Sequence, residues 1–235
     1  VEEFKVHILG VLENVIGTHR NLILARLEGG PLANTGVIAG MSGSPVYVDG
    51  KLIGAVAYGF SFSKEAIAGI TPIDEMLAID RAPLDLKTGG AVAVPIRDDI
   101  SQEELSGTFL KSLEARPQAR SAGLTIAPLE LPLMFGGFST GAFERARSFF
   151  APLGFRAVRA GTGGQSRPGQ PPGGPSLREG DAVGVQLLGG DLDISAVGTA
   201  TYVDGAKVLA FGHPLYNLGA VDYAMTRADI ITVMP

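Results

Sequence analysis

The chain contains no cysteine among its 235 residues. Disulfide bonds, a thiol nucleophile and thiolate metal ligands are therefore excluded. Histidine is also scarce, with three residues, and no cluster of acidic side chains has the spacing of a metal site. The sequence thus gives no reason to expect a metal ion or another cofactor.

Long apolar runs and clusters of basic residues are missing as well. No apolar run approaches the roughly 20 residues that cross a bilayer, so we expect no membrane-spanning segment. The net charge is −5, and the Lys and Arg residues do not gather in one place. Nucleic acid and anionic membranes are therefore not expected partners. We expect that both ends, Val1 and Pro235, were cut through structure, so a signal peptide could have preceded this fragment.

The chain is instead rich in glycine and proline, with 33 and 15 residues, and 46% of it is hydrophobic. This composition favours a folded protein of short strands and tight turns over a helical bundle. Alternating apolar residues predict strands over residues 3–12, 21–27, 46–48, 51–58, 69–73, 91–96, 107–113, 124–127, 182–188, 192–202 and 207–211. Asp49-Gly50 and Asp204-Gly205 predict hairpin turns.

Two helices and a linker complete the predicted organisation. Asp74 and Glu75 begin a predicted helix that runs to Ile79, and residues 140–150 carry a helical apolar stripe. Residues 161–176, rich in Gly and Pro, predict a mobile linker. We divide the chain into a β unit with the Ser motif (1–80), an insert and linker (81–176) and a β unit with the His motif (177–235) that is incomplete at its C-terminus.

The hexapeptide Gly40-Met41-Ser42-Gly43-Ser44-Pro45 carries the clearest chemistry. The two glycines lack Cβ atoms, so main-chain N–H groups near Ser42 can point at a substrate oxyanion. Pro45 fixes φ as the chain leaves the turn. Ser42 is a candidate nucleophile, although an ordinary Gly/Ser turn would also explain these six residues.

Of the three histidines, His213 is the candidate base. It lies between Gly212 and Pro214 at the end of an apolar strand, which is how a base is presented to a Ser hydroxyl. His7 in a strand and His19 in a polar loop are more typical of structural or solvated residues.

A second serine competes with Ser42. Gly137-Phe138-Ser139-Thr140-Gly141 fits the G-x-S-x-G nucleophile elbow of α/β-hydrolases, and Asp residues and His213 follow it. That fold needs a long parallel sheet with alternating helices, which this chain does not predict. We therefore interpret Ser139 as part of the N-terminal cap of the helix at 140–150.

The Ser and His segments resemble those of SpoIVB-type serine peptidases, the family of the stage IV sporulation signalling protease. The similar segments are residues 3–77, with GMSGSPVYVDGKLIGAVAYG, and residues 198–213, with GTATYVDG and LAFGH. More distantly, the layout of residues 40–79 is similar to the second barrel of chymotrypsin-like peptidases. The resemblance implies a mainly β fold, a chymotrypsin-like double β-barrel with a short helical insert.

The resemblance also implies roles for matched residues. Ser42 is the nucleophile, His213 the general base, and the N–H groups of Gly40 and Ser42 the oxyanion donors. The strand at 57–60 pairs with an extended substrate. In the family the His segment precedes the Ser segment, whereas here it follows, and we explain this order by a permutation of the two halves. The acid stays open between Glu28, Asp222 and residues beyond the chain.

The expected function is a serine endopeptidase that cleaves a protein or peptide through an acyl-enzyme. Its alternatives are a non-catalytic, peptidase-like binding or envelope scaffold, a site completed by residues beyond the two ends, and an α/β-hydrolase that uses Ser139. Tyr58 and Phe60 either border a P1 pocket or belong to the core, and we favour the core. The family association further implies a bacterial protein outside the cytoplasmic membrane.

Overall fold

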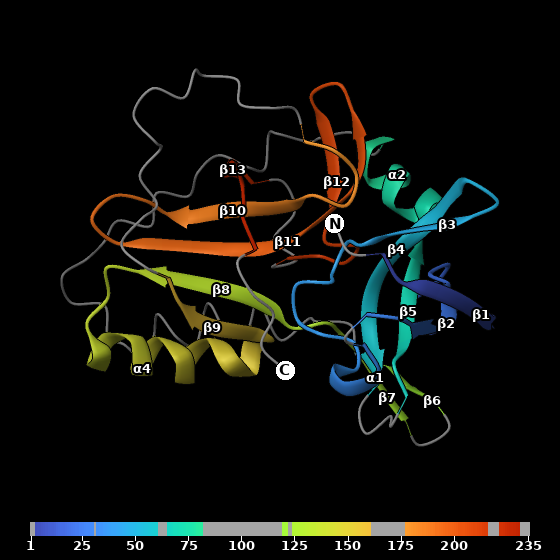
Figure 1. Cartoon of the computed structure of the whole chain (residues 1–235), viewed down its shortest axis with the longest axis horizontal. Helices are drawn as coiled ribbons and strands as arrows, with labels where there is room; N and C mark the ends of the chain where they lie inside the picture. Colours follow the sequence, from blue (N-terminus) through green and yellow to red (C-terminus); the bar gives the residue numbers. More distant parts are fainter. Residues whose placement is uncertain are drawn as a thin grey trace.

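Two β-sheets dominate the computed structural model (Figure 1), which describes residues 3–30, 32–60, 65–81, 119–121, 124–160, 177–215 and 221–230. The fold is mainly β, as the sequence predicts. Both sheets curl, which makes each of them barrel-like. No helix in these ranges is long and apolar enough to cross a membrane.

The first sheet is antiparallel, and the Ser motif lies beside it. Its order is β1 (Lys5–Leu12), β2 (Leu22–Glu28), β5 (Ile67–Pro72), β4 (Lys51–Phe60), β7 (Leu124–Pro128) and β6 (Ala119–Ser121), and β3 (Pro45–Val48) also pairs with β4. Two helices accompany it, α1 (Leu32–Thr35) and α2 (Ile73–Arg81). Its core buries Leu27, Val46, Val56 and Ile70.

The predicted turn between β3 and β4 is confirmed. Asp49 and Gly50 both have positive φ, 49° and 73°, and Val48 pairs with Lys51 across them. Such a two-residue turn matches the right-handed twist of the strands that it joins. It aligns β3, which begins three residues after Ser42, with β4.

The second sheet has the order β13 (Ala224–Arg227), β10 (Ala182–Leu188), β11 (Asp193–Asp204), β8 (Leu131–Gly136) and β9 (Phe155–Arg159), and β12 (Lys207–Ala210) pairs with β11. The pair β8 and β9 is parallel, and α4 (Thr140–Phe150) and the 3₁₀ helix η1 (Ala151–Leu153) connect the two strands. Figure 1 shows α4 along one side of this pair. Its apolar face buries Phe143 against Leu133, Phe135 and Phe155.

Chain segments between residues 119 and 159 contribute strands to both sheets. β7, predicted at 124–127, pairs with β4 of the first sheet, whereas β8 and β9 belong to the second. Of the elements in the described residues, β6, β8, β9, β13, α1 and η1 are not predicted from the sequence. The predicted strands at 91–96 and 107–113 and the linker at 161–176 lie outside the described residues. The division at residues 80 and 176 stays a prediction, although the sheets do not follow it.

Candidate active site

Ser42 lies on a tight turn between α1 and β3. Gly40 and Gly43 have φ of 92° and 94°, a region that glycine enters without strain. The N–H of Ser44 donates to the carbonyl of Met41 at 2.9 Å, and the N–H of Gly43 donates to Val56 of β4 at 2.7 Å. These hydrogen bonds hold the turn on the first sheet.

Gly43 is required by a close approach of two backbones. A Cβ atom on Gly43 would lie 2.1 Å from the carbonyl oxygen of Thr199 and 2.5 Å from the nitrogen of Phe211. Thr199 is in β11 and Phe211 follows β12, so both atoms belong to the second sheet or its hairpin. The Ser turn therefore packs directly on the segment that leads to His213.

His213 is positioned by an unusual turn after β12. Phe211 and Gly212 both have positive φ, 67° and 66°, which is uncommon for a residue as bulky as Phe. The hydroxyl of Thr71 in β5 donates to the carbonyl of Gly212 at 2.7 Å. The first sheet thus holds the backbone next to a histidine that the second sheet supplies.

The two candidate residues meet. Oγ of Ser42 lies 2.7 Å from Nε2 of His213, and 171 positions separate them in the chain. Nδ1 of His213 lies 3.1 Å from the carbonyl oxygen of Pro214, which can accept a hydrogen bond from the Nδ1–H group. The tautomer with hydrogen on Nδ1 satisfies both contacts, because Nδ1 then donates and Nε2 accepts the hydrogen bond of the Ser42 hydroxyl.

Two threonines of β11 join the halves of the site, and sequence reasoning assigned them no role. The hydroxyl of Thr199 donates to the carbonyl of Gly40 at 3.0 Å, and that of Thr201 donates to Gly43 at 2.7 Å. The N–H of Thr199 also donates to the carbonyl of Ser42 at 2.9 Å. Their i, i+2 spacing in Gly-Thr-Ala-Thr places both side chains on one face of the strand and was the available signal.

Two main-chain N–H groups of the Ser turn are not used in hydrogen bonds between described residues. The N–H groups of Met41, Gly43 and Ser44 all donate to carbonyl oxygens. Within the described part of the chain, the N–H groups of Gly40 and Ser42 donate to none. Ser42 is buried and Gly40 is partly buried, and a pair of donors spaced i−2 and i around a nucleophile suits a developing oxyanion.

Tyr58 lies next to this pair from the core side. Its ring centroid is 6.3 Å from that of His213, and 2% of the residue is exposed. Burial raises the pKa of Tyr58 to about 12, while Arg20 lowers it and Glu75 raises it further. Phe60 packs in the same apolar cluster, so both residues belong to the core.

The strand at 57–60 cannot pair with a substrate, contrary to our expectation. On one edge β4 pairs with β5, and on the other edge Tyr58, Gly59 and Phe60 pair with β7. The N–H of Leu129 also donates to the carbonyl of Ala57. Strand β7, which is far from β4 in the sequence, thus occupies the edge of β4 that we expected to bind the substrate.

Neither candidate acid is hydrogen-bonded to His213 among the described residues. The carboxylate of Glu28 lies 3.1 Å from Nε2 of His7, where both side chains are about half exposed. Asp222 is exposed. The third member of a triad stays a prediction.

Ser139 caps α4, as predicted. Its side chain accepts from the N–H of Ala142 at 3.4 Å, and its backbone is extended, with φ −63° and ψ 159°. The strained turn that exposes an elbow nucleophile is therefore missing at this position. Ser139 is also exposed, whereas His213 is bonded to Ser42.

Both residues of the pair are well shielded from solvent. Ser42 is 0% exposed and His213 is 7% exposed. Among the described residues, no group of three or more His, Asp or Glu side chains could hold a metal ion. The described site therefore consists of a serine, a histidine and main-chain N–H groups.

Residues 1–77 match the model of the family described as SpoIVB peptidase S55. The match includes Ser42 and its turn, and His213 lies outside it. Comparisons with curated proteins and with solved structures gave no significant match.

Proposed function

We propose that this chain, whose residues 1–77 match the SpoIVB peptidase S55 family, is an endopeptidase that cleaves protein or peptide through an acyl-enzyme on Ser42. The observation that carries the proposal is the 2.7 Å contact between Oγ of Ser42 and Nε2 of His213. A hydroxyl and a base within hydrogen-bond reach are the minimum of an activated nucleophile.

The reaction follows from the atoms in place. Nε2 of His213 takes the hydroxyl proton as Oγ of Ser42 attacks the substrate carbonyl carbon. The N–H groups of Gly40 and Ser42 stabilise the oxyanion, and such a donor contributes about 3–4 kcal/mol. The proton then passes from His213 to the leaving amine, and water activated by the same imidazole hydrolyses the ester.

In this mechanism the Pro214 carbonyl takes over one role of the acid of a catalytic triad, which is to orient the histidine ring. As an acceptor from Nδ1, it favours the tautomer and ring orientation that the base needs. A carbonyl carries no full charge, so it stabilises the imidazolium less than a carboxylate would. A Ser–His pair with a carbonyl orienter is sufficient for the mechanism that we propose.

The reversed order of the two segments is compatible with this function. The family match covers the Ser half alone, and the His half lies in the second sheet. We propose that the halves of the barrel pair have exchanged order, since geometry and not chain order defines such a site. From the family match of the Ser half we also propose that the protein is bacterial and acts outside the cytoplasmic membrane.

Labelling with a fluorophosphonate tests the proposal. The wild-type chain should form a covalent adduct, Ser42→Ala should not, and Ser139→Ala should react as the wild type does. Peptide mapping by mass spectrometry should find the adduct on the peptide that contains Ser42. Labelling lost with Ser139→Ala and kept with Ser42→Ala would contradict the proposal and assign the reaction to Ser139.

One observation favours a second candidate, the peptidase-like binding scaffold. Ser42 has no exposed surface, so a substrate carbonyl reaches Oγ only after the covering atoms move. A scaffold would bind peptides in calorimetry and give neither cleavage nor fluorophosphonate adduct. An adduct on Ser42 that forms faster when a peptide is added would instead indicate an enzyme that its substrate opens.

A further inference from the structure

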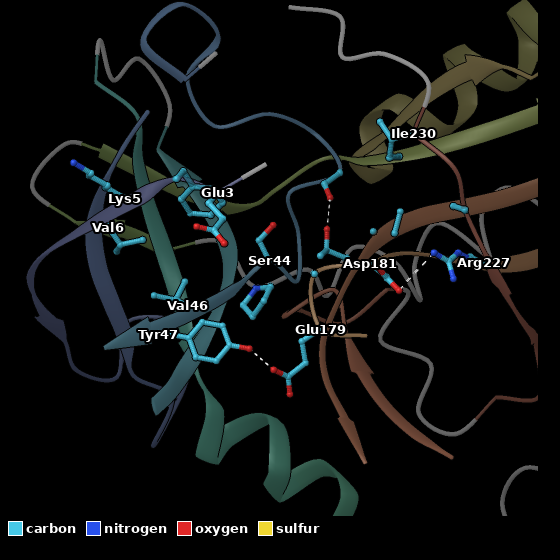
Figure 2. Close-up of a pocket in the computed structure, with 18 of the residues that line it drawn as sticks. Glu3, Lys5, Val6, Ser44, Val46, Tyr47, Glu179, Asp181, Arg227 and Ile230 are labelled. Carbon is cyan, nitrogen blue, oxygen red and sulfur yellow. Dashed lines mark hydrogen bonds and ion pairs between the residues drawn. The ribbon is translucent and has the colours of Figure 1, made fainter. Parts of the chain in front are cut away.

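A cavity of about 1320 Å³ lies between the two sheets and reaches the Ser turn. Gly40 and Ser44, on either side of Ser42, are in its wall. Figure 2 shows Tyr47 from the first sheet and Glu179, which precedes β10, pointing toward each other across it, and the Tyr47 hydroxyl donates to that carboxylate. The mechanism described above assigns no role to this cavity.

On the side of the first sheet, the cavity runs along strands β1 and β3. Residues 3–7, in and before β1, and residues 44–47, in and before β3, line it without interruption. Successive side chains of a strand point to opposite faces, so an unbroken run along a cavity indicates that the main-chain edge faces it. The cavity is thus bordered by backbone as well as by side chains.

Both edges are unpaired in the described part of the chain. β1 pairs with β2 alone, and β3 pairs with β4 alone. The first sheet therefore curls without closing, and the seam between β1 and β3 is open. Unpaired N–H and C=O groups along such a seam can accept one further strand.

The charges around the cavity favour a basic occupant. Its walls carry four acids, Glu3, Glu179, Asp181 and Asp229, and two permanent cations, Lys5 and Arg227. Arg227 lies 3.8 Å from Asp181, so its positive charge is balanced by that carboxylate. The remaining charges of the wall are three carboxylates and one lysine. This excess of negative charge favours positively charged side chains of a ligand.

We infer that this seam binds an extended, basic segment of the substrate polypeptide, which adds as a strand between β1 and β3 and leads its scissile bond to Ser42. The inference rests on the proposed function and gives it a substrate class: unfolded or loop segments that carry Lys or Arg. Folded regions whose strand edges are already paired would not be cleaved.

A thiol placed in the seam tests the inference, because the wild-type chain has no cysteine. Tyr47→Cys faces the cavity, and Val48→Cys is the matched control at the next position of β3, where the wild-type residues are 42% and 43% exposed. After reaction with a bulky maleimide, cleavage of a Lys-rich peptide should fall at least about tenfold at position 47, the loss of about 1.4 kcal/mol of binding. At position 48 it should stay within about twofold, which is the size of a surface effect.

Labelling of Ser42 by a small fluorophosphonate, measured on the same samples, separates this inference from the proposed function. If modification at position 47 reduces peptide cleavage more than it reduces labelling, the result supports binding of the substrate in the seam. Equal loss at positions 47 and 48, or cleavage unchanged at both, overturns it while labelling still reports the nucleophile. A change of oligomeric state at position 47 without loss of cleavage would also overturn it, and would assign the seam to a second copy of the chain.

Peptide chemistry gives an independent readout. Methylation of substrate main-chain nitrogens one at a time should reduce kcat/KM at alternate positions, because every second N–H of an added strand faces each neighbour. Exchange of the Lys residues for Glu should reduce it further. A uniform response along the peptide would overturn strand addition.

Discussion

Ser42 and His213 depend on glycines and threonines as much as on each other. The Ser turn approaches the second sheet so closely that position 43 has no room for a side chain. Thr199 and Thr201 donate to carbonyl groups of the turn, and the N–H groups of Gly40 and Ser42 donate to no acceptor among the described residues. At the scale of residues, the main-chain N–H groups that could bind an oxyanion are those that make no hydrogen bond within the described protein.

Gly43→Ala should remove activity and destabilise the fold. Its Cβ would meet backbone atoms at 2.1 and 2.5 Å, which flexible side chains cannot relieve. Gly50→Ala is the matched control, since Gly50 also has positive φ but open space around a Cβ, and should cost about 1 kcal/mol. Urea unfolding and fluorophosphonate labelling measure both variants. Equal effects at the two positions would contradict the close packing at Gly43.

Tyr58 should make the fold sensitive to alkali. Its pKa in the folded chain is about 12, above its ordinary value of 10.0, because it is buried. The unfolded chain therefore loses the phenolic proton first, so the contribution to stability is complete below pH 10 and is lost as the pH rises to about 12. Because the pKa of Tyr47 is also about 12, Tyr47→Phe serves as the background. Adding Tyr58→Phe should flatten the loss of stability between about pH 9 and about pH 11.5 in urea unfolding.

At the scale of elements, the sequence predicted those turns, helices and strands that depend on neighbouring residues in the chain. The turn at Asp49-Gly50, the helix capped by Ser139 and most strands with alternating residues were correct. β13 and the edge of β4 that β7 covers were not predicted, because pairing partners far along the chain decide them. The local sequence already indicated His213 as the candidate base, and the resemblance supported it. The i, i+2 spacing placed Thr199 and Thr201 on one face of a strand, but it did not indicate that this face would contact the Ser turn.

The cap of α4 should contribute to stability and not to catalysis. Ser139→Ala removes the acceptor for the N–H of Ala142 and should lower the free energy of unfolding by about 1 kcal/mol. Fluorophosphonate labelling of Ser42 should be unchanged, since Ser139 is exposed at the start of α4. Reduced labelling at unchanged stability would contradict the capping role.

Thr201→Val should affect both properties. It keeps the shape of the side chain and leaves the buried carbonyl of Gly43 without this donor, at a cost of about 1–3 kcal/mol. Labelling should slow as well, because the same hydrogen bond holds the Ser turn against β11. Thr140→Val, at the exposed first position of α4, is the control. Thr201→Val with wild-type labelling and stability would show that this hydrogen bond does not position the turn.

At the scale of the whole molecule, the candidate site exists because two sheets meet. The first sheet provides Ser42 and the hydroxyl of Thr71, and the second provides His213 and the threonines of β11. The sequence predicted the fold class and the serine and histidine that the structure brings together. It could not find the open seam between β1 and β3, because whether a sheet closes depends on long-range curvature.

The most direct test of the account is the rate at which fluorophosphonate modifies Ser42 in the wild-type chain and in His213→Ala. If His213 is the base, removing it should slow adduct formation by about 10²–10⁴-fold, while circular dichroism shows the same fold. Mass spectrometry of the digested protein reports the rate at the peptide that contains Ser42. Equal rates in the two proteins would contradict the catalytic pair.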